Sequence, residues 1–216
     1  MIHVDDTFKK LARRAVEIAH CYHHELLPGV LSSLLVMSKI FPRFNKARDI
    51  FVLSKGHAAP ALYSFLEHLG YSPDLHQMFP QRDVANGVHC TTGSLGHGLP
   101  LAVGMALAKK RRGDAGTVYV LMGDGECLEG TTWESLCVAD HLGLTNLQVH
   151  IDGNCCASLG DVPINAAPRL RIFFPLLVTY YLTVKGAGVS FLEGTKEHKR
   201  VLTDAEFKQA MKELEL

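Results

Sequence analysis

A buried strand, a helix and a second buried strand follow one another in the middle of the chain, and this succession restricts the fold more than any other feature. Residues 117–122 (TVYVLM) are almost continuously apolar, which is typical of a strand covered on both faces of a sheet. The capping-box pair Thr131 and Glu134 predicts the start of a helix, and residues 147–151 follow as the next strand. This spacing predicts a βαβ unit and therefore a parallel sheet.

The remaining sequence favours the same class of fold. Apolar periodicity predicts further helices at 5–22, 28–40, 58–69 and 203–214, one helix between the glycine-rich loop 91–98 and Gly113, and strands at 51–53 and 180–184. Residues 101–108 are apolar nearly all round, so we expect them to be buried. We expect an α/β fold, a parallel sheet flanked by helices, in one domain. Its parts would be a helical segment at 1–45, a core at 46–162, a shortened segment at 163–182, and a C-terminal strand and helix at 183–216.

Composition excludes several classes of protein. A chain of 216 residues that is 47% apolar and 20% charged can build a sizeable core, as soluble globular proteins do. Lys plus Arg equals Asp plus Glu, so no overall field favours nucleic acid or an anionic membrane. The apolar run 173–182 is too short to span a bilayer. The six cysteines form no C-x-x-C pair and follow no signal peptide, so we expect reduced thiols and a cytoplasmic protein.

Polar residues follow the two central strands at the points where those strands end. Gly123, Asp124 and Gly125 come after the first strand, and Asn154 comes after the second. Carboxyl ends of parallel strands meet at one edge of a sheet, so Asp124 and Asn154 should lie side by side. Their oxygens suit Mg²⁺ or Ca²⁺ completed by phosphate oxygens, and the following helix N-terminus attracts anions. On spacing alone, two ordinary turns explain these residues equally well.

The GDG turn followed, one βαβ unit later, by an asparagine resembles the thiamine diphosphate signature. With it, much of the chain resembles the N-terminal, diphosphate-binding half of transketolase, with motif order and spacing in agreement from about residue 8 to residue 162. The matching stretches are FVLSKGH at 51–57, TTGSLGHG at 91–98, GDGE at 123–126, TVKG at 183–186 and GVSF at 188–191. Several motifs in one order are far more specific than any single one.

The resemblance implies a role for each of three sets of residues. The cofactor would be bound by Gly93, Ser94, Leu95, Gly123, Asp124, Gly125, Glu126 and Asn154. A Mg²⁺ or Ca²⁺ ion would be held by the side chains of Asp124 and Asn154 and by the backbone carbonyl of Cys156. The catalytic set would be His57 near the diphosphate and substrate, His198 of a closing loop, and Glu129 at a subunit contact. The implied reaction is two-carbon ketol transfer between sugar phosphates, with thiamine diphosphate as cofactor.

The same resemblance implies a partner. Transketolases need a second domain that holds the aminopyrimidine ring, and this chain ends before such a domain. We therefore expect the N-terminal subunit of a split transketolase, which is silent alone, works with a C-terminal, pyrimidine-binding subunit, and self-associates into a homodimer or heterotetramer. Alternatives are a component of another thiamine diphosphate enzyme, such as the 1-deoxyxylulose-5-phosphate synthase type, and a non-catalytic paralogue that serves as a dimerisation or regulatory module.

Three departures from the family pattern favour the non-catalytic alternative. Family histidines would fall in the turns at 26–29 and 79–81, where this chain has LLPG and FPQ. His23, His24 or His89 would have to replace them. The segment between Ile164 and Val184 is also too short, because a βαβ unit usually needs about thirty residues.

Two rival readings rest on short motifs. His20, Cys21 and His24 lie within about one helical turn and suggest zinc, but no second ligand pair has suitable spacing. Gly186-Ala187-Gly188 is only a fragment of the dinucleotide-binding fingerprint. Surface and core histidines, and a turn, explain these residues more simply.

Overall fold

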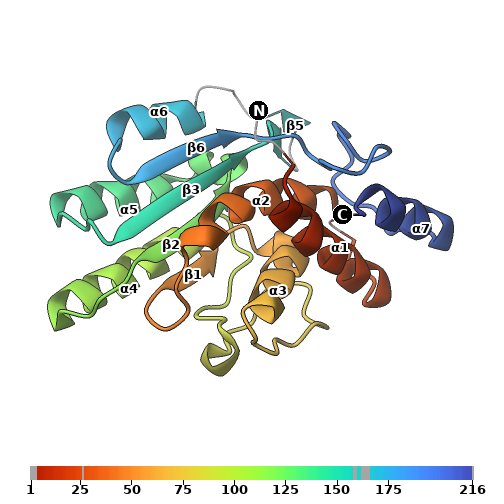
Figure 1. Cartoon of the computed structure of the whole chain (residues 1–216). Helices are drawn as coiled ribbons and strands as arrows, with labels where there is room; N and C mark the ends of the chain where they lie inside the picture. The colour runs from red at the N-terminus through yellow and green to blue at the C-terminus, as the bar shows by residue number, and fades with distance from the viewer. Residues whose placement is uncertain (1–3, 26, 158–159, 162–165, 216) are drawn as a thin grey trace.

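Four parallel strands form the central sheet of the computed structural model, which describes residues 4–25, 27–157, 160–161 and 166–215. Their order across the sheet is β1, β2, β3, β6, so the chain adds strands in one direction (Figure 1). The strands are β1 (Ile50–Leu53), β2 (Val118–Gly123), β3 (Leu147–Gly153) and β6 (Val178–Leu182). A two-residue antiparallel pair, β4 (Cys156–Ala157) with β5 (Gly160–Asp161), follows β3.

Helices cover both faces of this sheet. One layer contains α1 (Asp6–Cys21), α2 (Leu27–Ile40) and α3 (Ala59–His68), and α7 (Asp204–Glu213) packs on α1. The other layer contains α4 (Gly98–Arg112), α5 (Gly130–His141) and α6 (Ala166–Phe173). Short 3-10 turns are η1 (Phe41–Arg43), η2 (Gly56–Ala58), η3 (Val84–Asn86) and η4 (Asp124–Leu128). The predicted α/β class is therefore confirmed.

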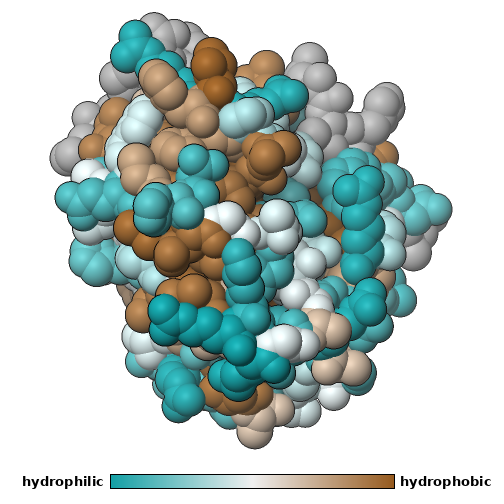
Figure 2. All heavy atoms as spheres, turned by 90° about the vertical axis from the view of Figure 1, so that its left-hand side faces the viewer, coloured by the Kyte–Doolittle hydropathy of each residue, from teal (hydrophilic) through white to brown (hydrophobic). Residues whose placement is uncertain are grey.

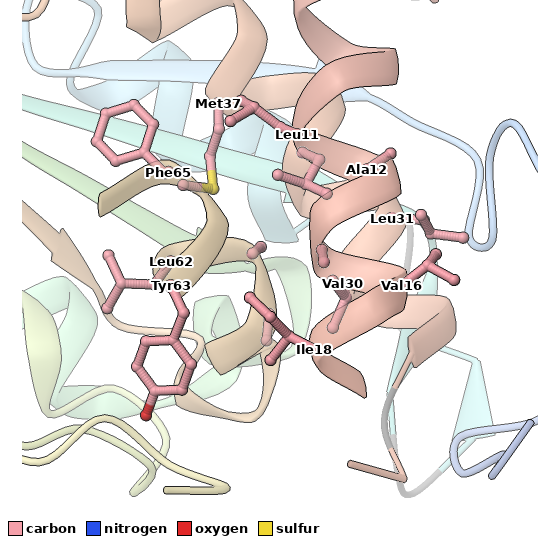
Figure 3. Packing of buried hydrophobic residues seen from close by; sticks show 14 of the residues in the cluster. Leu11, Ala12, Val16, Ile18, Val30, Leu31, Met37, Leu62, Tyr63 and Phe65 are labelled. Atoms are coloured by element: carbon pink, nitrogen blue, oxygen red, sulfur yellow. The ribbon is translucent and has the colours of Figure 1, made fainter. Parts of the chain in front are cut away.

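Alternating side chains of the strands feed two hydrophobic cores. Phe51 and Leu53 of β1 belong to the core shared with α1, α2 and α3, whereas Val52 faces the core under α4, α5 and α6. The first of these cores is filled mainly by helix residues, and Figure 3 shows side chains of the three helices meeting there. Both faces of the sheet are thus buried, which explains why β2 is a continuous apolar run.

Three details of the sequence prediction are wrong. Helix α5 starts at Gly130 without a side-chain cap, because Thr131 donates its hydroxyl proton to the carbonyl of Gly96, at 3.1 Å, and not to its own helix. The middle of α4 is not buried all round, since Leu101 is 46% exposed. Strand β6 begins at Val178, two residues before the predicted start, because it is aligned by pairing with Val149 of β3.

The shortened segment still completes a βαβ crossover. Helix α6, of eight residues, carries the chain from the end of the β4–β5 pair back to the start of β6. The apolar residues of α6 and of the turn after it divide between two environments. Leu170 and Leu177 are buried, whereas Phe173 and Leu176 are exposed. Apolar patches also reach the surface among hydrophilic residues on the side of the molecule where the strands begin (Figure 2). Within the described ranges, no helix is both long and apolar enough to cross a membrane.

Candidate functional site

A cavity of about 320 Å³ opens at the carboxyl ends of β1, β2 and β3. This is where open parallel sheets collect their ligands. Its walls come from loops far apart in the sequence. The lining residues are Gly29, Lys55, His57, Met78, Phe79, Gly93, Leu95, Gly123, Asp124, Gly125, Glu126, Asn154, Cys156, Lys185, His198 and Lys199.

The loops after β2 and β3 are joined directly by a hydrogen bond. The backbone N–H of Cys155 donates to Oδ2 of Asp124 at 2.6 Å, and the N–H of Gly125 donates to Oδ1 at 2.9 Å. Oδ1 of Asn154 accepts from the N–H of Cys156 at 3.1 Å. The expected proximity of Asp124 and Asn154 is therefore present in the fold, and both side chains line the cavity.

This arrangement offers oxygen ligands to a cation. Each oxygen of the Asp124 carboxylate accepts one backbone N–H, and a carboxylate oxygen has a second lone pair for another partner. In the part of the chain that the structure describes, no cluster of three or more His, Cys, Asp or Glu side chains surrounds a metal position. Asp124 and Asn154 therefore fit a hard cation that takes further oxygens from a ligand, as Mg²⁺ usually does.

Burial dominates the electrostatics of Asp124. It raises the pKa of this carboxyl group to about 6; the neighbouring Asp152 adds to the shift, and Lys55 opposes it. A carboxylate removed from water is costly when it lacks a close positive charge. The site is therefore one in which a positive charge next to Asp124 would be favourable.

Cationic side chains line the same cavity. Lys185 is only 4% exposed and lines the cavity, and among the described residues its ammonium group has no hydrogen-bond or ion-pair partner. Burial lowers the pKa of Lys185, with Lys55 adding to the effect. Lys199 and His198 also border the cavity. An ammonium group that lines a cavity without a partner indicates a site for an anion.

His57 lies beside these lysines and is uncharged. Burial lowers its pKa to about 3, and the positive fields of Lys55, His198 and Lys185 act in the same direction. The rings of His57 and His198 are 5.5 Å apart between centroids. A Cβ atom added to Gly29 would lie 3.2 Å from Nε2 of His57, so the glycine leaves space next to that nitrogen.

The cavity also has an apolar wall. Met78, Phe79 and Leu95 are partly exposed and line it. The ring of Phe79 lies over Gly93, where a Cβ atom would be 3.0 Å from the ring. One side of the cavity therefore suits a flat apolar group and the other a charged one.

Glu126 links three segments that border the cavity. It is fully buried and accepts hydrogen bonds from Ser54 Oγ at 2.5 Å, from the N–H of Gly123 at 2.9 Å and from the N–H of Gly96 at 3.1 Å. Burial raises the pKa of this carboxyl group, and these three donors oppose the rise. Glu126 thus ties the GDG turn to the end of β1 and to the glycine-rich loop.

Most of the residues implied by the resemblance come together here, but two do not. Ser94 does not line the cavity and contacts His97, with 3.2 Å between Oγ and Nδ1. Glu129 also lies outside the lining, half-buried beneath Gly96. The other ten, His57, Gly93, Leu95, Gly123, Asp124, Gly125, Glu126, Asn154, Cys156 and His198, all line it.

The substitute histidines are not in the cavity. His24 is buried elsewhere, where its Nε2 contacts the carbonyl oxygen of Leu75 at 2.9 Å, and neither His23 nor His89 lines the cavity. The two turns without histidine do reach it, through Gly29 on one side and Phe79 on the other. The suggestion that His23, His24 or His89 replaces the family histidines is therefore wrong.

The zinc reading is also wrong for the residues that the structure covers. His20 stacks on Phe207 with 4.2 Å between centroids and pairs with Asp204, whereas His24 contacts Leu75. The two imidazoles therefore have separate partners and share no metal position.

Three residues of the site were missed by sequence reasoning. Lys55 and Lys185 lie inside the SKGH and TVKG stretches, but a lysine next to a glycine carries no signal by itself. Asp152 is fully buried at the end of β3 and forms an ion pair with Lys55 at 2.5 Å. An acidic residue inside a predicted buried strand end was the available signal, because such a charge needs a partner.

The fold and the cavity define a class of protein: a parallel α/β sheet with a cavity at its strand ends that is lined by carboxylate, amide and ammonium groups. The comparisons with known proteins agree. The family model of the transketolase, thiamine diphosphate binding domain matches residues 37–171. The chain therefore belongs to the transketolase family of transferases and corresponds to its N-terminal, thiamine diphosphate-binding half.

Two relatives resemble the chain over most of its length, and each is named as one subunit of an apulose-4-phosphate transketolase. The relative from Actinobacillus succinogenes is 33% identical, over 79% of this chain and 77% of the relative. The protein of the same name from Phocaeicola vulgatus is 31% identical, over 95% of this chain and 92% of the relative. The match is thus to separate transketolase subunits of similar length, as expected for the split type.

Solved transketolase structures share the fold. That of Campylobacter jejuni superposes with a TM-score of 0.78 at 23% identity, covering 98% of this chain and 43% of the other. That of Leishmania mexicana gives 0.77 at 23% identity, covering 99% and 42%. This chain thus spans less than half the length of these two solved transketolases.

Proposed function

We propose that the chain binds thiamine diphosphate and a divalent cation in the cavity, and that it catalyses two-carbon ketol transfer between sugar phosphates together with a separate pyrimidine-binding subunit. The observation that carries the proposal is the presence of oxygen ligands and an unpaired cationic side chain in one cavity. Asp124 and Asn154 offer oxygens, and Lys185, which has no ion-pair partner among the described residues, offers a positive charge. A metal diphosphate has the matching charges.

Each group of lining residues would then have a distinct role. Asp124, Asn154 and the backbone carbonyl of Cys156 would hold the cation, and Lys185 with Lys55 would neutralise the remaining charge of the diphosphate. Thiamine diphosphate, when bound, supplies the carbanion chemistry that breaks and forms the carbon–carbon bond. Met78, Phe79 and Leu95 would exclude water from its ring.

The uncharged His57 would act on the substrate through hydrogen bonds. A neutral imidazole has one donor and one acceptor nitrogen, so His57 can hold a proton on one nitrogen and accept one on the other. The space that Gly29 leaves beside Nε2 supports this position for the reacting sugar. His198, half-buried near His57, would complete the same end of the cavity.

Exposed apolar residues around the site support a partner subunit. Leu95, Leu101, Leu128 and Val138 belong to the glycine-rich loop, α4, η4 and α5, and each is more than two-fifths exposed. Apolar groups of this kind favour association when they gather on one surface. The half-buried Glu129 lies among the same elements, which supports its proposed place at a subunit contact.

The test is co-expression with the pyrimidine-binding subunit, followed by a ketol-transfer assay. Apulose 4-phosphate, named in two relatives, is one donor to include in a panel of ketose phosphates. The proposal predicts turnover by the complex that needs thiamine diphosphate and Mg²⁺, and no turnover by either chain alone. A pure complex that binds the cofactor but transfers no ketol unit from any donor would contradict it.

That contrary outcome is the second candidate function, and one observation favours it. The turns at 26–29 and 79–81, in which family histidines would contact substrate, contain no histidine and line the cavity with Gly29 and Phe79. A chain that binds cofactor and partner without turnover would be a dimerisation or regulatory module.

A further inference from the structure

Asp152 is the centre of a buried polar network beneath the cavity. It is 0% exposed, and its Oδ2 accepts hydrogen bonds from Lys55 Nζ at 2.5 Å and from Ser32 Oγ at 2.8 Å. Its Oδ1 accepts from the hydroxyl of Thr183. The donors come from the end of β1, from α2 and from the end of β6. One carboxylate therefore fixes the relative position of three elements around the site.

Ser32 extends this network to Asn154. Nδ2 of Asn154 donates to Ser32 Oγ at 3.0 Å, while Oδ1 accepts from the N–H of Cys156 on the loop that also contacts Asp124. Ser32 is itself fully buried. The amide of Asn154 is thus held between a hydroxyl group on one side and a backbone N–H on the other.

The carboxylate of Asp152 determines which group donates and which accepts in the chain of hydrogen bonds Asp152–Ser32–Asn154, called the relay from here on. An ionised carboxylate only accepts hydrogen bonds, so the single hydroxyl proton of Ser32 points at Asp152. Ser32 Oγ is then left as an acceptor for Asn154, which must present its NH₂ group and turn its oxygen the other way. Lys55 forms an ion pair with the buried Asp152 at 2.5 Å, which supplies the partner that a buried carboxylate needs.

We propose that Ser32 is a positioning residue for Asn154. Because its hydroxyl donates to Asp152, Ser32 accepts from the NH₂ group of Asn154, and the amide oxygen of Asn154 then faces the bound cation. This inference rests on the proposed function for its cation, while the relay itself is a property of the ligand-free chain. A flipped amide would place two N–H donors against a positive charge. The orientation therefore decides whether Asn154 attracts or repels the metal.

Ser33 provides a matched control. Both serines are fully buried on α2. Ser33 donates to the carbonyl of Gly29 at 2.8 Å, and Ser32 Oγ, whose proton goes to the nearer Asp152, lies 3.2 Å from the same carbonyl oxygen. Ser33 Oγ is 3.4 Å from Oδ2 of Asp152 and has no hydrogen bond to Asn154 among the described contacts. Ser32→Ala and Ser33→Ala should therefore lower the Tm by similar amounts, but only Ser32→Ala breaks the relay.

The first experiment follows the side-chain amide protons of Asn154 in ligand-free protein. Selective ¹⁵N-asparagine labelling gives five side-chain signals at most, from Asn45, Asn86, Asn146, Asn154 and Asn165. The Asn154 signal is the one that disappears in Asn154→Asp. We expect its hydrogen exchange to be faster in Ser32→Ala than in wild type, and unchanged in Ser33→Ala. Unchanged exchange in Ser32→Ala, or an equal rise in both variants, overturns the relay.

The second experiment titrates Mg²⁺ by calorimetry at saturating thiamine diphosphate, with the partner subunit present. We expect Ser32→Ala to need about tenfold more Mg²⁺ for half-saturation, the usual effect of removing a residue that orients a metal ligand, and Ser33→Ala to match wild type. An unchanged Mg²⁺ requirement in Ser32→Ala overturns the positioning role. If wild type itself binds no thiamine diphosphate, the proposed function fails, and the exchange experiment alone decides the relay.

Discussion

Asp124 combines a structural and a chemical task in one side chain. Its carboxylate accepts the backbone N–H groups of Gly125 and Cys155, so it fastens the turn after β2 to the loop after β3. The same side chain lines the cavity. Because a carboxylate can accept up to about four hydrogen bonds or metal contacts, closing the loop and binding a cation are compatible.

Replacing Asp124 by asparagine should separate these tasks. The volume is nearly unchanged, but the charge is lost and one oxygen becomes an NH₂ group that cannot accept from Gly125 or Cys155. We expect no measurable Mg²⁺-dependent binding of thiamine diphosphate by calorimetry, with a loss of unfolding free energy of about 1–3 kcal/mol from the unsatisfied N–H group. The exposed Asp140 on α5 is the control, and Asp140→Asn should behave as wild type. Normal binding by Asp124→Asn would refute the metal assignment.

Residues of the site differed in how far the sequence could reveal them. Asp124 and Asn154 were accessible because each directly follows a strand, and parallel strands place their ends together. Lys55, Asp152 and Ser32 were not, because their function lies in contacts across 97 and 120 positions of sequence. Such contacts follow from the packing of α2 against β3, which no local pattern encodes.

At the scale of elements, the close approach of α4 to the end of β1 shapes the glycine-rich loop. A Cβ atom on Gly98 would lie 2.5 Å from Oγ and 2.6 Å from Cα of Ser54, so the helix can begin there only with a glycine. Ser54 in turn donates to Glu126, which holds the GDG turn. The start of α4 is therefore part of the framework of the cavity.

Two alanine substitutions in α4 should have opposite signs. Gly98→Ala forces the helix away from Ser54 and should cost about 1–3 kcal/mol of unfolding free energy. Gly104→Ala, in the middle of the same helix with nothing within 4 Å of its Cβ position, should add up to about 1 kcal/mol, since alanine favours the helix. Urea unfolding of both variants measures this. Equal effects of the two changes would mean that the approach to Ser54 is not limiting.

The buried His150 of β3 makes the stability of the sheet depend on pH. Burial lowers its pKa to about 4, and its ring stacks between Tyr119 and Tyr181. The folded state thus favours the neutral imidazole. The stability that this preference contributes is fully present above the pKa of His150 in the unfolded chain, about 6.5. It is lost as the pH falls to and through the pKa in the folded state, by about 1.4 kcal/mol per pH unit between the two.

Removing this titration should flatten the acid limb of the stability profile. His150→Phe keeps a flat ring between the two tyrosines and has no proton to bind. We expect the difference in unfolding free energy between pH 7 and pH 5 to be smaller in His150→Phe than in wild type, as measured by urea unfolding at each pH. The exposed His141 is the control, and His141→Phe should keep the wild-type slope. Parallel profiles for His150→Phe and wild type would contradict this assignment.

The elements were predicted better in type than in extent. The βαβ pattern predicted the parallel sheet because β2 is an apolar run that burial on two faces explains, and β3 follows it after one helix. The start of α5 was missed because Thr131 bonds to Gly96 of another loop, and the start of β6 because its register is set by β3. In both cases a contact distant in sequence overrode the local signal.

At the scale of the whole molecule, the cavity draws on nearly every layer of the fold. α2 contributes Gly29, the turn after β1 contributes Lys55 and His57, and the segment after β6 contributes Lys185 and His198. A ligand that fills the cavity therefore contacts α2 and the loops that follow β1, β2, β3 and β6 at once. Its binding should stabilise the complete fold and not one local region.

Thiamine diphosphate with Mg²⁺ should accordingly raise the Tm of the chain. At ligand concentrations about 100 times the Kd, linkage gives about 2.7 kcal/mol, or about 5–10 °C for a domain of this size. Differential scanning calorimetry measures the shift, which EDTA should abolish because the diphosphate would lose its cation. A Tm that stays constant with the cofactor, with the partner subunit present as well as absent, would argue against cofactor binding.

The sheet ends at β6, and no other strand within the described residues pairs with its outer side. Natural proteins commonly guard such a border with lysine, proline or a bulge, and the sequence of β6, VTYYL, contains none of the charged residues or proline. Its outer backbone is thus a template for one more extended peptide. At high concentration we expect intermolecular β-structure, seen as a growing infrared amide I band and light scattering, and suppressed by Thr179→Lys at an exposed position. The solution behaviour of this chain thus depends in part on this unguarded border of its sheet.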